Sequence, residues 1–353
     1  MTLSRPVFSS ARDEGDEHDS EARSACRNRC GNAIMAPPAR WPLLDRLHRT
    51  AVGDVMTEMT DEDVKTSFDP LRPRLIRIAY RMLGSVSEAE DIVQEAFLRW
   101  LDTDRVTVKE PSAFLRRIVT RLCLDQLKSA RRRRETYLGP WLPEPIVEES
   151  DDLDDITLPL MMALERLSPL ERAAFLLHDV FGVSFDEIGE TIGRKPAACR
   201  QLASRARVNI RNARRRFAMP REQGLEIASA FFAASRGGDM QQLRSLLATE
   251  AIVYADGGGK TVAPRRPIVG LDKVMKLHAS LALIFAQTMS RLVRYDFING
   301  LPGFITIEDG EILQTTALEI EQDRITAIYV TRNPEKLKHL PETLRHFGGH
   351  AVH

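Results

Sequence analysis

The sequence predicts a mainly α-helical protein followed by a C-terminal α+β domain, and three observations support this fold class. Apolar residues recur at helical spacing from Ser67 to Phe217, with one acidic, proline-containing interruption. From Glu222 to about Leu340, helical patterns alternate with runs of strand spacing. Aromatic residues make up only 6% of the 353 residues, which suits helices better than a large β-sandwich.

The composition is that of a globular protein rather than a fibrous, disordered or membrane-spanning one. The 50 basic and 50 acidic residues balance, and 43% of the chain is hydrophobic. No apolar run approaches the roughly 18–20 residues that cross a bilayer, and the N-terminus lacks the apolar core of a secretion signal. The four cysteines do not form a disulfide framework. We therefore expect a cytoplasmic protein with no membrane partner.

Residues 1–65 have no sustained periodicity and are predicted to be a disordered tail, part of which could reflect a mis-assigned start site. Cys26 and Cys30, with His18 upstream, match no zinc template and lack a fourth ligand, so we expect no metal there. Residues 341–353 are assigned to a C-terminal tail.

The first helical block, residues 66–138, contains three predicted helices. The first ends at Gly84, a capping box from Ser87 to Glu90 opens the second, and Pro111 opens the third. A linker follows at residues 139–157, where prolines precede a run of six carboxylates. Such a run is ordinarily solvated and extended.

Residues 158–217 have the pattern of a helix-turn-helix. Ser168 and Ser184 cap two short helices, Gly193 makes the turn, and Pro196 opens a long third helix. That helix and its approach carry many arginines and no acid, which favours DNA binding over a merely solvated basic face. The residues predicted to contact DNA near its start are Lys195, Arg200, Gln201, Ser204 and Arg205.

Residues 220–340 are predicted to form the α+β domain. Helices are expected at 222–236, 239–247 and 271–285, and strands at 250–255, 291–298, 303–308, 311–320 and 324–331. The dipeptide Asp309-Gly310 predicts a hairpin turn between two of these strands.

The stretch AEDIVQEAF at 89–97, with the order of the two helical blocks, resembles the bacterial extracytoplasmic-function (ECF) sigma factors. The resemblance implies that the first block binds core RNA polymerase at its β′ clamp and opens the −10 element. It implies that the second block reads the −35 element, and that the β flap is a further contact on the polymerase. The residues implied to face the polymerase are Asp91, Gln94 and Glu95, which taken alone could be the polar face of an amphipathic helix.

By the same resemblance, the third helix of the first block contacts the −10 element, and the loop 102–110 before it holds a flipped base. The residues implied to contact this DNA are Arg116, Arg117, Thr120, Arg121 and Asp125. The acidic linker, in a sigma factor, would mimic RNA in the polymerase channel.

Three short strings resemble the subgroup of these sigma factors, numbered group 41, that carries a SnoaL-like, NTF2-like cone domain. They are WLPEP at 141–145, DGGGK at 256–260 and NPEKL at 333–337. The glycines of the second string would allow close backbone approach to the linker or the helical blocks. The residues implied to be regulatory are Trp141, Pro143, Glu144, Asp256, Gly257, Gly258, Gly259, Lys260, Asn333, Pro334, Lys336 and Leu337.

The sequence thus predicts an alternative sigma factor that is regulated in cis by its C-terminal domain. We expect promoter DNA and core polymerase as partners, no separate anti-sigma factor, no cofactor and no enzymatic activity. The alternative is a stand-alone helix-turn-helix regulator whose NTF2-like domain senses a small ligand in its pocket or catalyses a reaction. The acid/base candidates for such an enzyme are Tyr254, Asp256, His278 and Asp296.

Overall fold

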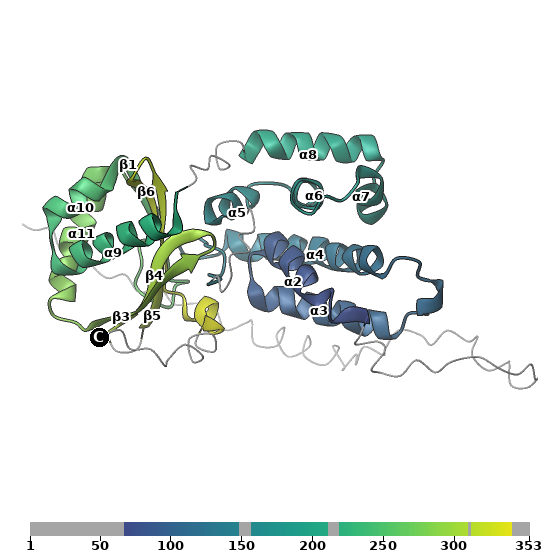
Figure 1. The fold of residues 1–353 in the computed structure, drawn as a ribbon, viewed down its shortest axis with the longest axis horizontal. Helices are drawn as coiled ribbons and strands as arrows, with labels where there is room; N and C mark the ends of the chain where they lie inside the picture. The colour runs from purple at the N-terminus through teal and green to yellow at the C-terminus, as the bar shows by residue number, and fades with distance from the viewer. Residues whose placement is uncertain (1–66, 148–156, 211–218, 310–311, 341–353) are drawn as a thin grey trace, which may run out of the picture. The chain divides into compact units, whose positions relative to one another are not determined.

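The computed structural model describes residues 67–147, 157–210, 219–309 and 312–340 (Figure 1). The predicted N-terminal tail, the acidic run after Val147, the arginines beyond Ile210 and the C-terminal tail lie outside these ranges. The expected fold class is confirmed, because helices come first and a domain built on a six-stranded sheet follows. None of the helices in the described ranges has the length and apolar composition needed to cross a bilayer.

The first helical group consists of α2 (Arg72–Leu83), α3 (Val86–Leu101), η1 (Arg105–Thr107) and α4 (Pro111–Glu135). Gly84 ends α2 with a left-handed backbone, φ 72°. Ser85 is extended and accepts a hydrogen bond from the Glu88 amide, so it caps α3. The capping box predicted at Ser87 and Glu90 is therefore wrong by two residues, because Ser87 already lies inside the helix.

The second helical group consists of α5 (Leu158–Leu164), α6 (Pro169–Phe175), the π-helical turn η2 (Leu176–Val180), α7 (Phe185–Ile192) and α8 (Pro196–Ile210). The capping box predicted at Ser168 and Glu171 is confirmed. Ser184 caps α7 by accepting a 3.2 Å hydrogen bond from the Glu187 amide. The Glu187 side chain, predicted to complete a capping box with Ser184, pairs with Arg116 instead. Gly193 ends α7 with φ 67°, and α8 follows in the helix-turn-helix order that the sequence predicts.

The two helical groups share one buried core. Met82 and Trp100 of the first group belong to the same cluster of buried side chains as Leu164 and Phe175 of the second. All four are at most 1% exposed. Burial of apolar surface therefore holds the two groups against each other in this conformation.

The sheet domain begins with α9 (Arg221–Gly237) and α10 (Met240–Leu246), has α11 (Leu271–Phe285) after its second strand, and ends with η4 (Pro334–Leu337). Its strands are β1 (Leu247–Asp256), β2 (Ile268–Val269), β3 (Ser290–Ile298), β4 (Leu301–Glu308), β5 (Ile312–Glu321) and β6 (Arg324–Thr331). They lie in the order β2-β1-β6-β5-β4-β3, with β1 and β6 parallel and the other neighbours antiparallel. The predicted β4–β5 hairpin is confirmed, whereas β2 is too short to show any alternation in the sequence.

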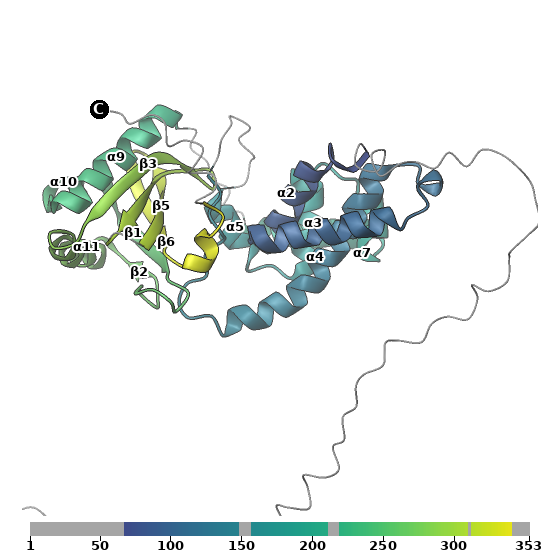
Figure 2. The ribbon, with the colours of Figure 1, turned by 90° about the horizontal axis from the view of Figure 1, so that it is seen from below.

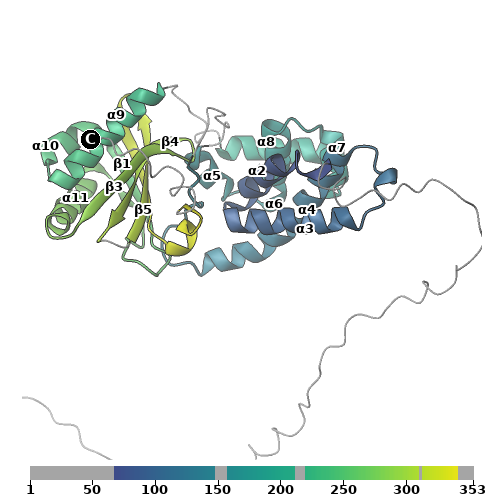
Figure 3. The same cartoon turned by 60° about the horizontal axis from the view of Figure 1, so that its bottom comes forward.

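Different parts of the chain cover the two faces of the sheet. Helices α9, α10 and α11 lie along one face of the sheet (Figures 2 and 3). On this face Phe231 and Val274 pack with Phe304 of β4. The next residue, Ile305, points to the opposite face because side chains alternate along a strand. There it packs in a cluster with residues of the linker, α5 and η4, namely Leu142, Val147, Leu158 and Leu337. The linker thus completes the second core of the sheet domain.

Candidate nucleic-acid interface and linker junction

Helix α8 presents most of the residues that the sequence predicts to read duplex DNA. Four of them are exposed: Lys195, Arg200, Gln201 and Ser204. The buried side of the helix is formed by Cys199 and Leu202, so the predicted residues share the solvent side. Arg205 is exposed too, but its Nε donates a 2.8 Å hydrogen bond to Oε1 of Glu171, and this bond lowers the pKa of the carboxyl group.

The arginines that the sequence assigns to the −10 element lie on α4 and are bonded to α7. Arg116 forms an ion pair with Glu187, and Arg117 Nη2 lies 2.9 Å from Glu190 Oε2. Arg121 donates hydrogen bonds to the carbonyl oxygens of Thr191 (2.9 Å) and Glu190 (3.0 Å). The guanidinium groups on this face of α4 are therefore bonded to the helix-turn-helix, although Arg121 keeps an exposed side chain.

Two further residues of the predicted −10 set differ from each other. Asp125 is exposed and lies 2.7 Å from the Lys128 ammonium. Thr120 is fully buried, and its hydroxyl has no hydrogen-bond partner among the described residues. The side chain of Thr120 faces the packed interior here, so its predicted contact with DNA requires the helix to be uncovered.

Helix α3 exposes the residues implied to face the polymerase. Asp91, Gln94 and Glu95 are exposed, and Glu95 pairs with Arg99 one turn later at 2.9 Å. Leu98 lies on the same side, since residues three or four apart share a helix face, and it is 49% exposed. Sequence reasoning missed Leu98, because a leucine in an amphipathic helix is ordinarily taken as core.

Asp256, the last residue of β1, is the centre of a junction between the linker and the sheet domain. Its side chain is completely buried. Oδ1 accepts hydrogen bonds from the Tyr137 hydroxyl (2.5 Å) and the Gly258 amide (3.1 Å). Oδ2 accepts from the Leu142 amide (2.9 Å) and the Lys336 ammonium (2.7 Å). One carboxylate thus joins all three strings of the sequence or their immediate neighbours.

Lys336 supplies the positive charge of this junction. Its side chain is buried, and Nζ also donates to the carbonyl oxygen of Leu142. Nζ lies 4.1 Å from the Trp141 ring centroid and 5.0 Å from that of Tyr137, so both rings face the cation. Burial and the Asp256 carboxylate raise the pKa of the Tyr137 hydroxyl, which therefore stays a donor.

The glycine loop after β1 passes very close to its neighbours. Gly258 and Gly259 have left-handed backbones, with φ 60° and 71°. A Cβ on Gly258 would collide with the Asn333 amide, and one on Gly259 would lie 2.8 Å from Leu138 Cδ1. Glycine is required at both positions, as the expected close approach implies. Beyond them, Lys260 forms an exposed ion pair with Glu335.

Glu144 connects the linker to the first helical group. Its carboxylate accepts hydrogen bonds from Ser85 Oγ (2.8 Å) and the Val86 amide (2.7 Å), at the start of α3. A negative charge at a helix N-terminus is favourable because the amides there point outward. The Tyr80 hydroxyl donates to the Glu144 carbonyl oxygen at 2.7 Å, and the Trp141 ring packs against Gly84.

Asn299 is a junction residue that the sequence analysis did not identify. It sits between β3 and β4 with φ 48° and is 6% exposed. Its amide and carbonyl groups bond to Ile146 (2.9 Å) and to Leu158 (2.9 Å), which lie on either side of the acidic run. Its side chain bonds to the Ile146 amide (2.8 Å) and the Glu144 carbonyl oxygen (3.3 Å). The dipeptide Asn299-Gly300 could have predicted the turn, but not these distant partners.

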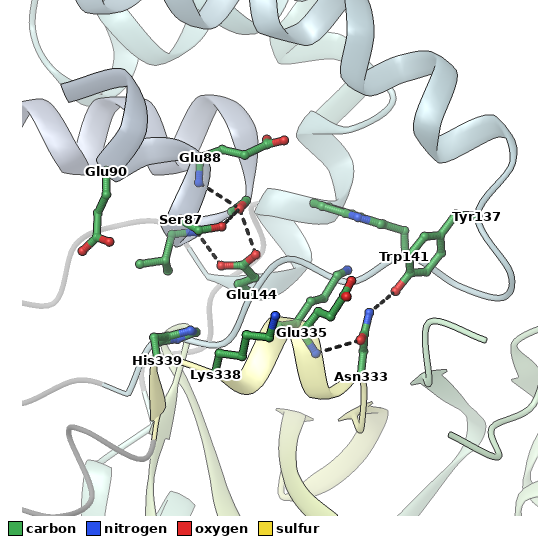
Figure 4. Close-up of a pocket in the computed structure, with 13 residues that line it drawn as sticks. Ser87, Glu88, Glu90, Tyr137, Trp141, Glu144, Asn333, Glu335, Lys338 and His339 are labelled. Atoms are coloured by element: carbon green, nitrogen blue, oxygen red, sulfur yellow. Dashed lines mark hydrogen bonds between the residues drawn. The ribbon is translucent and has the colours of Figure 1, made fainter. Parts of the chain in front are cut away.

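A pocket of about 480 Å³ opens where α3, the linker and η4 meet (Figure 4). Glu88 and Glu90 of α3 line it together with Glu335 and the two residues after η4, Lys338 and His339. His339 Nε2 lies 2.8 Å from the Pro145 carbonyl oxygen. Water therefore reaches the edge of the junction, whereas Asp256 and Lys336 stay buried.

The four acid/base candidates of the enzyme alternative have separate partners. No hydrogen bond or ion pair among the described residues joins any two of them. Tyr254 stacks on Tyr329, Asp296 pairs with Arg294, and Asp256 serves the junction. Burial, with Arg236 nearby, lowers the pKa of His278 to about 4, so its imidazole is neutral.

Comparisons with known proteins agree with this arrangement. The family described as Sigma-70 region 2 matches residues 68–133, and Sigma-70, region 4 matches residues 157–210. The sigma factor SigJ of Mycobacterium tuberculosis is 37% identical over 78% of this chain and 94% of its own length. SigI of the same species is 31% identical over 78% and 95%. The crystal structure of SigJ superposes with a TM-score of 0.61, at 34% identity, over 77% of this chain and 98% of SigJ. The chain therefore belongs to the ECF family of RNA polymerase sigma factors, and it acts in transcription initiation.

Proposed function

We propose that the exposed face of α3 binds core RNA polymerase, that α8 reads the −35 element, and that α4 contacts the −10 element during melting. We further propose that the sheet domain regulates these steps in cis through the linker. The observation that carries the proposal is the buried pair Asp256–Lys336, because it fixes the linker between the two DNA-contacting groups.

The cis regulation follows from what the junction holds. A sigma factor must place its two DNA-contacting groups at separate promoter elements, so the chain between them has to be free to adjust. Here Leu142 is bound by Asp256, and Glu144 is bound to the start of α3. The sheet domain therefore restrains the linker and supports α3 at the same time. In this role it takes the place of a separate anti-sigma factor and needs no enzymatic activity.

The first experiment tests the polymerase contact. Full-length chain is mixed with bacterial core RNA polymerase and separated by size. Wild type should elute with the polymerase, and Gln94→Ala/Glu95→Ala should elute with it much less. A matched control, Glu222→Ala/Glu226→Ala on α9, removes exposed polar groups from the sheet domain and should behave as wild type. Equal co-elution of all three would contradict the assignment of α3.

The second experiment tests the restraint. Removing residues 333–353 deletes Asn333 and Lys336 and should raise promoter output in a reconstituted transcription assay. Removing residues 218–353 also deletes the support of α3 and should lower it. Asp256→Asn should act like the shorter deletion, with the 85%-exposed Asp272 as the matched Asp→Asn control. Unchanged output in both truncations would refute regulation by the sheet domain.

A further inference from the structure

Helices α4 and α7 are held together by ion pairs between arginines of α4 and glutamates of α7. Glu187 stands at the third position after the cap residue Ser184, where a glutamate ordinarily bonds back to the cap amide. Instead its carboxylate pairs with Arg116, whose side chain is only 12% exposed. Glu190, one turn later, pairs with Arg117. Both glutamates therefore serve a distant helix rather than their own.

The groups that α7 offers resemble a nucleic-acid backbone in their chemistry. Carboxylate and phosphate oxygens accept charge-assisted hydrogen bonds from guanidinium groups in the same manner. The carbonyl oxygens of Glu190 and Thr191, at the negative end of the α7 dipole, complete the set by binding Arg121. Three arginines of α4, namely Arg116, Arg117 and Arg121, thus face acceptors of the kind that DNA phosphates present.

This arrangement does not fit a promoter-bound chain. The −10 and −35 elements lie about 25 base pairs apart, or roughly 85 Å at about 3.4 Å per base pair. Helix α8 follows α7 after a short turn, and its 15 residues span only about 22 Å. With α7 bonded to α4, the exposed residues of α8 lie far too close to α4 to reach both elements. The described conformation is a closed one.

We propose that α7 masks the −10 surface of α4 in the closed conformation, with Glu187, Glu190 and the end of α7 occupying Arg116, Arg117 and Arg121 in place of DNA phosphates. The proposal rests on the proposed −10 role of these arginines. It differs from the linker restraint because both partners belong to the helical groups, so the mask persists when the sheet domain is altered.

Masking lowers the affinity of the free chain for −10 DNA, because only molecules in the open conformation can bind it. When only a fraction of molecules is open, the apparent dissociation constant for −10 DNA rises by the inverse of that fraction. The buried core shared by the two helical groups and the Arg172 bond to the Met82 carbonyl oxygen (2.6 Å) also favour closure. Core polymerase, which separates the two groups along a promoter, is the partner that removes the mask.

The first test uses Glu187→Gln/Glu190→Gln, which removes both ion pairs and keeps side-chain size. The probe is a fluorescein-labelled single-stranded DNA of mixed sequence, titrated with the full-length chain at several salt concentrations. The variant should bind about fivefold more tightly, and its log–log salt slope should steepen by about 2, since each of three arginines adds about 0.7. Asp186→Asn is the matched control, because Asp186 is exposed on the same turn and carries no ion pair to α4.

A third variant adds Arg116→Ala/Arg117→Ala/Arg121→Ala to the double glutamine substitution. The gain in affinity should disappear, because the unmasked arginines are then missing. If the gain persists, the removed α7 charges act on DNA directly and the proposal is overturned. Equal gains in Asp186→Asn and the double variant would overturn it as well.

A second measurement follows opening without DNA. Spin labels at Ser129→Cys on α4 and Asn209→Cys on α8, both exposed, report the separation of the two groups by pulsed electron spin resonance in a Cys26→Ser/Cys30→Ser background. Glu187→Gln/Glu190→Gln should increase the population at long distance. An unchanged distribution would overturn the proposal. Opening without any gain in DNA binding would show that the proposed −10 role of the arginines is wrong. That result would also overturn the masking proposal, which rests on this role.

Discussion

Helices α4 and α8 both carry arginines that are assigned to promoter DNA, yet the two sets differ in their exposure and in their bonding partners. On α8 the predicted residues face solvent. Among the ion pairs of the described residues, Arg205 alone of this set has a carboxylate partner, which is Glu171 of α6. On α4, Arg116 and Arg117 are partly buried, Arg121 is exposed, and all three are bonded to α7. The two helices have similar chemistry, so the difference lies in what covers them.

The comparison indicates an order of events. A surface that is exposed in the free chain is available for an initial encounter, whereas a covered surface becomes available only after a conformational change. With the proposed roles, the −35 surface on α8 is of the first kind and the −10 surface on α4 is of the second. The proposal then predicts that recognition of duplex DNA precedes access to the element that is melted.

The largest effect is expected from Arg172→Ala, which breaks a buried contact between the two helical groups. Arg172 is 3% exposed and donates to the carbonyl oxygens of Met82 and Leu164 and to Glu165, and burial lowers its pKa to about 10. Its loss should reduce the free energy of unfolding by about 3 kcal/mol or more. Urea unfolding followed by circular dichroism measures this. Arg166→Ala, at an exposed site, should leave the midpoint unchanged, and a similar midpoint for both variants would contradict the argument.

The next effect tests the comparison directly. On a promoter duplex recovered by selection with the holoenzyme, Arg200→Ala should weaken binding of the free chain by about 1–3 kcal/mol. Arg117→Ala should change free-chain binding little, because α7 already occupies that side chain. In the holoenzyme both variants should weaken binding. Arg244→Ala, which is exposed on the sheet domain, is the control in both assays. An equal loss for Arg200→Ala and Arg117→Ala in the free chain would remove the distinction between the helices.

A smaller effect is expected for Leu98→Ala on α3. Exposed large apolar side chains beside polar contacts are frequent anchors of protein interfaces. Because Leu98 shares its face with Gln94 and Glu95, its truncation should weaken core-polymerase binding by about tenfold. Fluorescence anisotropy with labelled chain measures the affinity. Leu283→Ala, another exposed leucine on α11, should leave it unchanged, and an unchanged value for Leu98→Ala would exclude this anchor.

The smallest effect is a pH dependence of stability that arises from His278 in the sheet domain and not from the helical groups. The pKa of His278 falls from its ordinary 6.5 to about 4 on folding, so the unfolded chain binds more protons between these values. Stability from this group is therefore present above pH 6.5 and is lost as the pH falls towards 4. Between pH 7 and 5.5 the loss should be about 1 kcal/mol. Thermal unfolding of wild type and His278→Phe measures it, and the same pH dependence in both would contradict the assignment.

Local signals predicted most of the elements. The capping box at Ser168, the turn at Gly193 and the strand alternation after Arg324 each depend on residues a few positions apart, so the sequence displays them directly. The three short strings also pointed correctly to segments that meet, and Asp256 lies where they do. The type of most helices and strands, and their order along the chain, could therefore be predicted.

Contacts between distant segments could not be predicted in this way. Glu187 reads as a capping-box residue, and nothing nearby in the sequence shows that its carboxylate binds Arg116, 71 positions away. Thr120 reads as a polar helix residue and is buried by packing. The acidic run that was expected to be solvated lies outside the described residues. No local signal shows that the segment before it, from Leu142 to Val147, contributes to the core of the sheet domain. Tertiary packing decides these positions.

The way in which the linker completes the sheet domain has a consequence during synthesis. The residues that bind the linker from η4, such as Lys336, are translated well over a hundred residues after the end of α8. At about 5–20 residues per second, the ribosome needs roughly 10 s to make that stretch. Each newly made molecule thus has a brief interval in which both helical groups exist without the restraint that the finished chain imposes. Under the proposed restraint, newly synthesised and mature molecules of the same sequence would differ in how readily they bind core polymerase.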